Sequence, residues 1–358
     1  PVPVAASLKA IAYGLGMERV APALAAAGCQ IYFVALPSEG IALRKILPRA
    51  CIVVLSGADR DSAPLLVRNR LSPALNSLDQ IDGWRTICAA GEDVEAAVLH
   101  LDTGMSRLGM SPADLSTLAA EPERLEGIRL QCVLSHLACA DEPEHPMNAA
   151  QREAFVSATA AIRPATGPVA RSLANSAGAF LGRDYHFDLI RPGAGLYGIN
   201  PTPAGANPMR QAVHLYGRIV QVREVDAPQT VGYGATHRIV GPSRIATVAI
   251  GYADGYMRAV GSAASGANAH HGDAAMAAVP RGYIGETPVP VVGRVSMDLI
   301  TLDVTGVDPA AARPGGIVEL LGPHVSTDQL ASWAGTIGYE ILTGLGARLH
   351  RVYAGETS

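Results

Sequence analysis

The stretches AAVLHLD (residues 96–102) and LQCVLSH (residues 130–136) decide the fold of this chain. Each is a short, almost continuous apolar run that ends in polar residues, which is typical of a strand buried on both faces of a parallel sheet. Six further runs of this type lie at residues 2–7, 31–36, 51–56, 71–75, 169–175 and 187–191. Amphipathic stretches typical of helices separate most of them. Eight such units predict an α/β fold, a (β/α)8 TIM-like barrel.

The residue pattern changes after residue 212. Runs such as LYGRIVQVREV (215–225) are β-branched and interrupted by Pro and Gly, which predicts a mainly β second domain. We expect residues 1–210 to form the barrel domain and residues 211–358 the β-rich C-terminal domain. The small-residue stretch 261–280 is expected to be a flexible excursion, and its pair His270–His271 lacks the further ligands of a metal site.

Composition excludes several classes of protein. Of 358 residues, 49% are hydrophobic and 17% charged, which excludes an intrinsically disordered chain. A net charge of −4 argues against a nucleic-acid partner, and no apolar stretch reaches the ~20 residues of a membrane span. Five cysteines without a CxxC pair indicate free thiols and a cytoplasmic location. Because the chain does not begin with Met, we expect further residues upstream.

Lysine is scarce in this chain. Of 28 basic residues only Lys9 and Lys45 are lysines, and all others are arginines. A guanidinium is always protonated and cannot form a Schiff base, so imine chemistry would have to use one of these two amines. Lys45 lies in a helical pattern, for which Ser38 is the expected N-cap, whereas Lys9 follows the first strand.

In a barrel of this kind the reactive residues lie at the carboxyl ends of the strands. The residues expected there are Lys9, Tyr13, Asp102, Arg107, His136, Asn175, Ser176, Arg191 and the turn PGAG at 192–195. The loops after the last two strands are the usual place for a phosphate group. A lysine, an arginine and a phosphate site together suggest pyridoxal phosphate as the cofactor.

Nine motifs, in order along nearly the whole chain, resemble those of the alanine racemases, a pyridoxal-phosphate-dependent family of fold type III. They are KAIAYGLG (9–16), LDTGMSRLG (101–109), SHLACADE (135–142), SLANSAG (172–178), IRPGAGLYG (190–198), GYGATH (232–237), IGYADGY (250–256), GRVSMD (293–298) and GYEILTGLGARLHRVY (338–353). Single motifs of this length occur by chance, but nine in family order are very specific.

The resemblance implies a role for each candidate residue. Lys9 would hold the cofactor covalently, and Lys9 and Tyr252 would be the two acid–base groups on opposite faces of the substrate. Arg191 would face the pyridine nitrogen, and His136 coupled to Arg191 would stabilise the Tyr252 anion. Cofactor contacts are implied for Lys9, Tyr13, His136, Asn175, Ser176, Arg191, Gly193, Ala194 and Tyr339, and substrate contacts for Arg107, Tyr252, Met297 and Asp298. No metal is implied.

The implied activity is that of an isomerase that interconverts L-alanine and D-alanine and supplies D-alanine for peptidoglycan synthesis. The resemblance also implies an obligate homodimer with composite active sites, in which Tyr252 and Met297 reach the cofactor of the neighbouring subunit. Three alternatives stay open: a racemase for serine or of broader specificity, a related decarboxylase, and a non-catalytic pyridoxal-phosphate carrier.

The sequence departs from the family at His100. Many relatives have a lysine here, seven residues before the arginine that corresponds to Arg107, and its carbamate orients the guanidinium. A histidine cannot form this carbamate. We therefore expect either an inorganic anion such as chloride between His100 and Arg107, or a neutral His100 that is only hydrogen-bonded.

Overall fold

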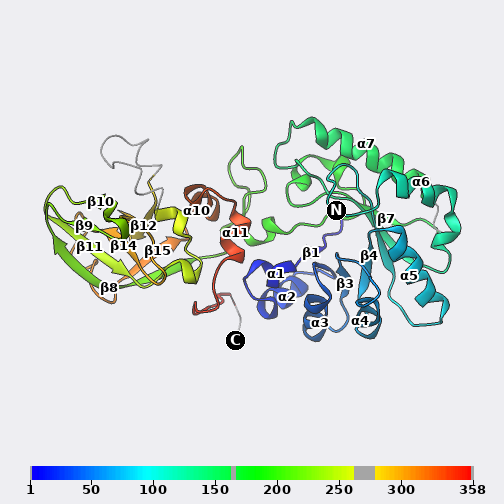
Figure 1. The fold of residues 1–358 in the computed structure, drawn as a ribbon, viewed down its shortest axis with the longest axis horizontal. Helices are drawn as coiled ribbons and strands as arrows, with labels where there is room; N and C mark the ends of the chain where they lie inside the picture. Colours follow the sequence, from blue (N-terminus) through cyan, green and yellow to red (C-terminus); the bar gives the residue numbers. More distant parts are fainter. Residues whose placement is uncertain (1, 163–166, 262–278, 356–358) are drawn as a thin grey trace. The chain divides into compact units, whose positions relative to one another are not determined.

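The computed structural model describes residues 2–162, 167–261 and 279–355, and the chain divides into two compact units (Figure 1). The first comprises residues 1–196 and 200–208, and the second residues 197–199 and 209–358. Most of the expected excursion, residues 262–278 with the pair His270–His271, lies outside the described residues.

Seven parallel strands form the sheet of the first unit, in simple sequence order. They are β1 (Ala6–Ser7), β2 (Ile31–Val34), β3 (Cys51–Val54), β4 (Ser72–Leu75), β5 (Ala97–His100), β6 (Leu130–Leu134) and β7 (Ala170–Ser172). The helices of this unit are α1 (Lys9–Tyr13), α2 (Met17–Ala26), α3 (Pro37–Ile46), α4 (Ala63–Arg68), α5 (Leu78–Ala89), α6 (Pro112–Ala120) and α7 (Pro146–Ala161). Helices α3 to α7 lie on the outside of the curled sheet (Figure 1). Short 3-10 turns are η1 (Pro122–Leu125), η2 (Gly178–Phe180), η3 (Arg183–Tyr185) and η4 (Ala194–Tyr197).

The eighth predicted strand closes the barrel without forming a full ladder. The segment around Ile190 lies between β7 and β1: the Asp188 N–H donates to the Arg171 carbonyl (2.9 Å), and the Ala5 N–H donates to the Ile190 carbonyl (2.9 Å). A single parallel bridge pairs Ile190 with Val4. The barrel predicted from the apolar runs is therefore confirmed, with its last strand reduced to one bridge.

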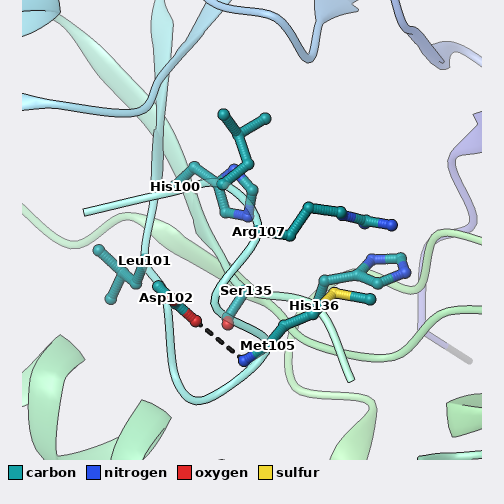
Figure 2. A pocket seen from close by; sticks show the side chains of 8 residues that line it. His100, Leu101, Asp102, Met105, Arg107, Ser135 and His136 are labelled. Atoms are coloured by element: carbon teal, nitrogen blue, oxygen red, sulfur yellow. Dashed lines mark hydrogen bonds between the residues drawn. The ribbon is translucent and has the colours of Figure 1, made fainter. Parts of the chain in front are cut away.

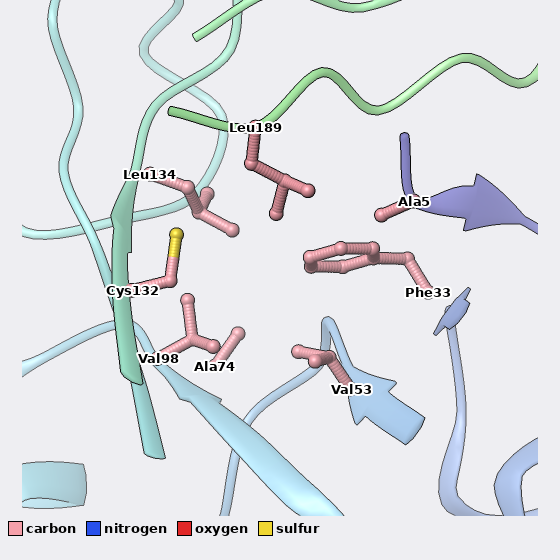
Figure 3. Packing of buried hydrophobic residues seen from close by; sticks show 8 residues of the cluster. All are labelled: Ala5, Phe33, Val53, Ala74, Val98, Cys132, Leu134 and Leu189. Atoms are coloured by element: carbon pink, nitrogen blue, oxygen red, sulfur yellow. The ribbon is translucent and has the colours of Figure 1, made fainter. Parts of the chain in front are cut away.

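Apolar side chains from around the barrel fill its interior (Figure 3). The cluster consists of Ala5, Phe33, Val53, Ala74, Val98, Cys132, Leu134 and Leu189, all buried. The guanidinium of Arg191 lies 5.9 Å from the centre of the Phe33 ring, within the range of a cation–π attraction. Because the interior is packed, a ligand can bind only at the rim, where Arg191 lies.

Helix α3 begins two residues earlier than the sequence predicts. Its N-cap is Leu36 rather than Ser38, and Pro37 is the first helical residue. The Glu39 carboxylate accepts the N–H groups of Ala35 (2.8 Å) and Leu36 (3.2 Å) instead. The prediction of Ser38 was wrong because the Glu39 carboxylate caps this end from inside the helix.

The second unit is built on an antiparallel six-stranded sheet in the order β13-β12-β15-β8-β11-β14. Its strands are β8 (Leu215–Val225), β11 (Ser243–Val248), β12 (Arg281–Ile284), β13 (Thr287–Pro290), β14 (Ile300–Asp303) and β15 (Ile317–Leu321). A separate pair joins β9 (Thr230–Val231) and β10 (His237–Arg238), and η5 (Tyr233–Ala235), η6 (Tyr252–Asp254), α10 (Thr327–Ala334) and α11 (Gly338–Thr343) complete the unit. The mainly β architecture predicted for this part is confirmed. In the described part of the chain, none of the helices has the length and hydropathy to cross a membrane.

Candidate active site

Lys9 follows β1, at the start of a turn with the opposite hand to an ordinary helix. Residues 10–13 all have φ between 53° and 56°. The Ala12 N–H donates to the Leu8 carbonyl, and the Gly14 N–H to the Ala10 carbonyl, both at 2.8 Å. Left-handed geometry costs an L-residue about 1–2 kcal/mol, so the surrounding barrel must hold this turn in place. Strained backbone of this kind is concentrated at functional sites.

The surroundings of Lys9 favour its uncharged form. Burial lowers the pKa of the Lys9 amine, and the positive charge of Arg107 lowers it further, while Glu39 acts in the opposite direction. A lysine with a lowered pKa has a larger neutral fraction and is a better nucleophile than a fully solvated one. Lys9 is therefore suited to covalent attachment of a carbonyl compound.

The turn after the last barrel strand forms a donor-rich cradle. The Ser176 hydroxyl oxygen accepts the N–H groups of Gly193 (2.9 Å) and Gly195 (3.1 Å), so its hydrogen points elsewhere. A Cβ on Gly193 would lie 2.1 Å from the Tyr13 hydroxyl, so only glycine permits this approach. Ala194 is buried, and its N–H meets no acceptor among the described residues. This donor set fits the phosphate of pyridoxal phosphate.

Arg191 is a buried and rigidly held cation. It donates to the Ser172 hydroxyl (2.5 Å) and to the Ser135 carbonyl (2.6 Å). Burial lowers its pKa to about 10, against a weak opposite effect of Cys132, so it stays charged at neutral pH. His136 is coupled to Arg191 electrostatically: burial first, and then Arg191, holds the pKa of His136 well below its usual range. His136 is therefore a neutral imidazole beside a fixed cation.

Arg107 lies on the loop after β5, at a small cavity. The cavity is lined by His100, Leu101, Asp102, Met105, Arg107, Leu108, Ser135 and His136 (Figure 2). The Asp102 carboxylate accepts the N–H groups of Gly104 (2.9 Å), Met105 (3.0 Å) and Ser106 (3.1 Å). These three bonds fold the loop around Asp102 and present the exposed Arg107 at the rim.

His100 closes the inner side of this cavity. It is buried, and its Nδ1 lies 2.7 Å from the Oδ1 of Asn76, a residue that directly follows β4. Of the two sequence-based expectations for His100, the hydrogen-bonded form agrees with this contact. The sequence reasoning missed Asn76, although the rule that reactive residues follow barrel strands applies to it as well.

In the second unit, Arg348 connects two loops that carry predicted site residues. Arg348 donates to both carboxylate oxygens of Asp254 (2.9 and 3.0 Å) and to Asp298 (2.7 Å). The Tyr252 N–H donates to the Ser296 carbonyl (3.1 Å), so the backbones of the loops also pair. The sequence did not single out Arg348 or Asp254 for this link, although both are charged residues inside the quoted motifs.

Tyr252 and Met297 line a second cavity, of about 470 Å³. Its lining consists of Tyr233, Gly234, Tyr252, Arg258, Arg294, Val295, Ser296 and Met297. The side chains of Tyr252 and Met297 are 41% and 54% exposed, so both are accessible in the single chain. Close packing of Gly251 against Met297 fixes this edge, because a Cβ on Gly251 would lie 2.3 Å from the Met297 carbonyl oxygen.

Asn175 and Tyr339 are two further residues of the predicted site. The Asn175 side-chain oxygen accepts the Gly178 N–H (2.8 Å) at the start of η2, which leaves its amide nitrogen for a ligand. Tyr339 lies in α11, in the second unit, and is 40% exposed. Within the described residues no group of three or more His, Cys, Asp or Glu side chains is arranged to hold a metal ion.

Comparison with known proteins identifies the family. The model described as alanine racemase, N-terminal domain, matches residues 1–201, and that described as alanine racemase, C-terminal domain, matches residues 212–353. The chain belongs to the alanine racemase family. The family inferred from nine sequence motifs is therefore confirmed.

Individual relatives support the same assignment. An alanine racemase of Rhodospirillum rubrum is 50% identical over 97% of this chain and 88% of its own length. A catabolic alanine racemase of Mesorhizobium japonicum is 46% identical over 97% of this chain and 86% of its own length. The crystal structure of the Bartonella henselae alanine racemase with covalently bound pyridoxal phosphate is 35% identical and superposes with a TM-score of 0.89, over 99% of this chain and 93% of that one.

Proposed function

We propose that this chain racemises alanine by moving a proton between Lys9 and Tyr252 on opposite faces of the substrate. The enzyme is an isomerase of the alanine racemase family, and its cofactor is pyridoxal phosphate. The observation that carries the proposal is the barrel rim, which combines a lysine of lowered pKa, a fixed arginine and a phosphate-type cradle. Both domains of the family are present in the same chain.

The barrel residues would hold the cofactor. Lys9 would bind it covalently, Tyr13, Ser176, Gly193, Ala194 and Tyr339 would hold its phosphate, and His136, Asn175 and Arg191 would surround its ring. When bound, pyridoxal phosphate supplies an electron sink that acidifies the Cα–H bond of the amino acid. Because Arg191 retains its proton at neutral pH, it would not protonate the ring nitrogen. A weaker electron sink favours return of the proton to Cα over transfer of the amino group.

Inversion at Cα requires two acid–base groups. A single base would return the proton to the face from which it came, so Lys9 would serve one face and Tyr252 the other. Arg107 would bind the substrate carboxylate, for which a planar guanidinium is well suited. Met297 and Asp298 would border the same carboxylate, with Arg348 holding Asp298 in place.

We also propose an obligate homodimer in which Tyr252 and Met297 serve the cofactor of a second copy of the chain. The exposure of both side chains at a cavity of about 470 Å³ supports this arrangement. The domains would be residues 1–210, which bind the cofactor, and residues 211–358, which complete the partner's site. Free cysteines support a cytoplasmic location.

Subunit complementation tests the composite site. Lys9→Arg and Tyr252→Phe homodimers are each expected to be inactive, and co-expression of the two chains should restore activity. In the mixed dimer one site combines an intact Lys9 with an intact Tyr252 from the other subunit. A site formed within a single chain would stay inactive in every mixture, so absence of restored activity in purified mixed dimers would contradict the proposal.

The two-lysine composition makes the cofactor test unambiguous. Borohydride reduction of the holoenzyme should fix one pyridoxyl group per chain on the peptide that contains Lys9. Lys9→Arg should abolish both the visible absorbance and the label, with racemisation falling at least about 10³-fold. Lys45→Arg is the matched control and should leave label and activity intact. A label on Lys45 would contradict the assignment.

Alanine is proposed as the preferred substrate, with D-alanine supplied for peptidoglycan synthesis. Rates of D-isomer formation from L-alanine, L-serine and larger amino acids would separate a specific alanine racemase from a broader one. Growth of a D-alanine auxotroph carrying this chain, without added D-alanine, would support the proposed supply role.

A further inference from the structure

His100 and Asn76 form a buried polar pair that the proposed chemistry does not use. His100 ends β5 and Asn76 follows β4, so the two lie at the carboxyl ends of neighbouring strands. Both are 6% exposed, and the His100 Nδ1 lies 2.7 Å from the Asn76 Oδ1. A buried histidine needs a defined partner for each ring nitrogen, because an unpaired buried polar group is costly.

The surroundings of Asn76 fix which way its amide faces. Its Nδ2 donates to the Leu55 carbonyl (3.1 Å), which can only accept, so the amide oxygen must face His100. Its backbone N–H donates to the Gln80 side chain (2.9 Å), which anchors the residue further. Because the amide oxygen is an acceptor, the His100 Nδ1 must carry the hydrogen. In the neutral ring, Nε2 then has a free lone pair.

The charges that face His100 come from three parts of the barrel. Arg107 and Asp102 lie on the loop after β5, His136 follows β6, and Arg191 lies between β7 and β1. Burial first, and then the positive charges of Arg191 and Arg107, lower the pKa of His100 to about 4, while Asp102 acts in the opposite direction. His100 is thus neutral at neutral pH and lines the same cavity as Arg107 (Figure 2).

We propose that Asn76 and His100 form a positioning pair for Arg107, in which the fixed Nδ1–H tautomer offers the Nε2 lone pair to a guanidinium N–H. This inference rests on the proposed function, in which Arg107 binds the substrate carboxylate. A neutral acceptor orients the guanidinium and leaves its positive charge available to the carboxylate. A permanent anion at the same place would neutralise part of that charge.

A neutral His100 leaves no place for an anion between its ring and Arg107. The cavity that both line has a volume of about 10 Å³, room for about one water molecule. A lone pair on Nε2 repels an anion, so chloride would need the charged ring. We therefore expect racemisation to be insensitive to replacement of chloride by acetate, and to removal of bicarbonate.

Nitrogen-15 spectra of the histidine-labelled holoenzyme test the tautomer directly. The His100 ring, assigned by its absence in His100→Asn, should show a protonated Nδ1 and an unprotonated Nε2 between about pH 5 and 8. A protonated Nε2 at neutral pH would overturn the inference. The nitrogen-15 spectrum does not depend on enzyme turnover. It can therefore contradict the tautomer of His100 while the proposed function stands, whereas absence of racemase activity would contradict the proposed function.

Asn76→Asp tests the link to the substrate. A carboxylate beside Nδ1 raises the pKa of His100, so the ring becomes charged as the pH falls and repels Arg107. The KM for alanine should rise about 10–100-fold at the acidic end and recover at the alkaline end, with a smaller change in kcat. In an Arg107→Ala variant, the further substitution Asn76→Asp should raise the KM little more, because both substitutions affect the same contact with the substrate carboxylate.

Asn148→Asp is the matched control. Asn148 is a buried asparagine on α7 whose Nδ2 donates to the Glu142 carbonyl (2.9 Å). Its variant is expected to lose stability without a pH-dependent KM. An equal KM profile in the two variants would show that Asn76 acts only on the fold, and a chloride requirement in the wild-type enzyme would overturn the neutral acceptor.

Discussion

The two units treat their functional side chains in opposite ways. In the barrel, Ser176 and Arg191 are buried, and each has hydrogen-bond partners that leave it little freedom. In the β-rich unit, Tyr252 and Met297 are exposed, and the contacts that hold their loops run through the backbone and Arg348. The barrel is thus preorganised to bind one ligand, whereas the β-rich unit presents reactive groups to a site that the proposal places on another copy of the chain.

The largest effect is expected from the exposed side of this comparison. Tyr252→Phe should lower racemisation about 10²–10⁴-fold in both directions, because the equilibrium constant between the enantiomers is unity. Exchange of the Cα hydrogen for solvent deuterium should continue for the enantiomer that Lys9 deprotonates and stop for the other. Tyr233→Phe, in the same cavity, is the control and should leave both exchanges unchanged. Equal loss of exchange for both enantiomers would contradict the two-base assignment.

A smaller effect should follow from disturbing the preorganised barrel. Gly193→Ala places a Cβ against the Tyr13 hydroxyl and should weaken cofactor binding at least about tenfold, measured by equilibrium titration of the apoenzyme. Gly83→Ala, in α5 where nothing lies within 4 Å of the added Cβ, is the matched control. If both variants bound the cofactor alike, the cradle would be more adaptable than its contacts suggest.

The Arg348 link between the loops of the second unit is expected to stabilise this unit. Arg348 and the Gly251 N–H lower the pKa of Asp254, in spite of burial that acts to raise it. Because the pKa of Asp254 is lower in the folded state, ionised Asp254 stabilises the fold at any pH above its unfolded-state pKa of about 4. This stabilisation is lost as the pH falls through the folded-state pKa. In urea unfolding, Arg348→Met should therefore be less stable than wild type at neutral pH, with a smaller difference in acid. Arg223→Met, exposed on β8, serves as the control.

The smallest effect tests the strained turn after Lys9. Ile11 has a φ of 56° and is 58% exposed, so Ile11→Gly should stabilise the protein by about 1 kcal/mol, seen as a rise in Tm of about 2–4 °C. Val156→Gly, at an exposed position of right-handed helix α7, should lower stability by about the same amount. If Ile11→Gly and Val156→Gly changed the stability in the same direction, the left-handed conformation of residue 11 would be contradicted.

Much of the fold could be predicted from the sequence. Seven of the apolar runs became strands within a few residues, because a strand buried on both faces leaves a continuous apolar signal. The eighth run forms only one bridge, at Ile190, and no full strand. Pro192, which follows it, has no backbone N–H to donate to a neighbouring strand. The start of α3 was misplaced because capping by Glu39 depends on where its side chain folds back.

The site could be predicted in part. Residues inside quoted motifs, such as Lys9, Ser176 and Arg191, lie at the barrel rim where the strand-end rule places them. Asn76 was missed because its role depends on a contact between neighbouring strands, 24 positions apart in sequence, that no local pattern records. The left-handed turn of residues 10–13 was missed for another reason: it contradicts the intrinsic preference of every residue in it.

That turn has a consequence beyond the position of one amine. Residues 10–13 follow the hand that D-amino acids prefer, so a free segment of this sequence would abandon it. We therefore expect Lys9 to keep its place only while the folded barrel packs around this turn. The visible absorbance expected when the cofactor is attached to Lys9 would then be an optical signal of completed folding, and a chain that folds only in part would lack it.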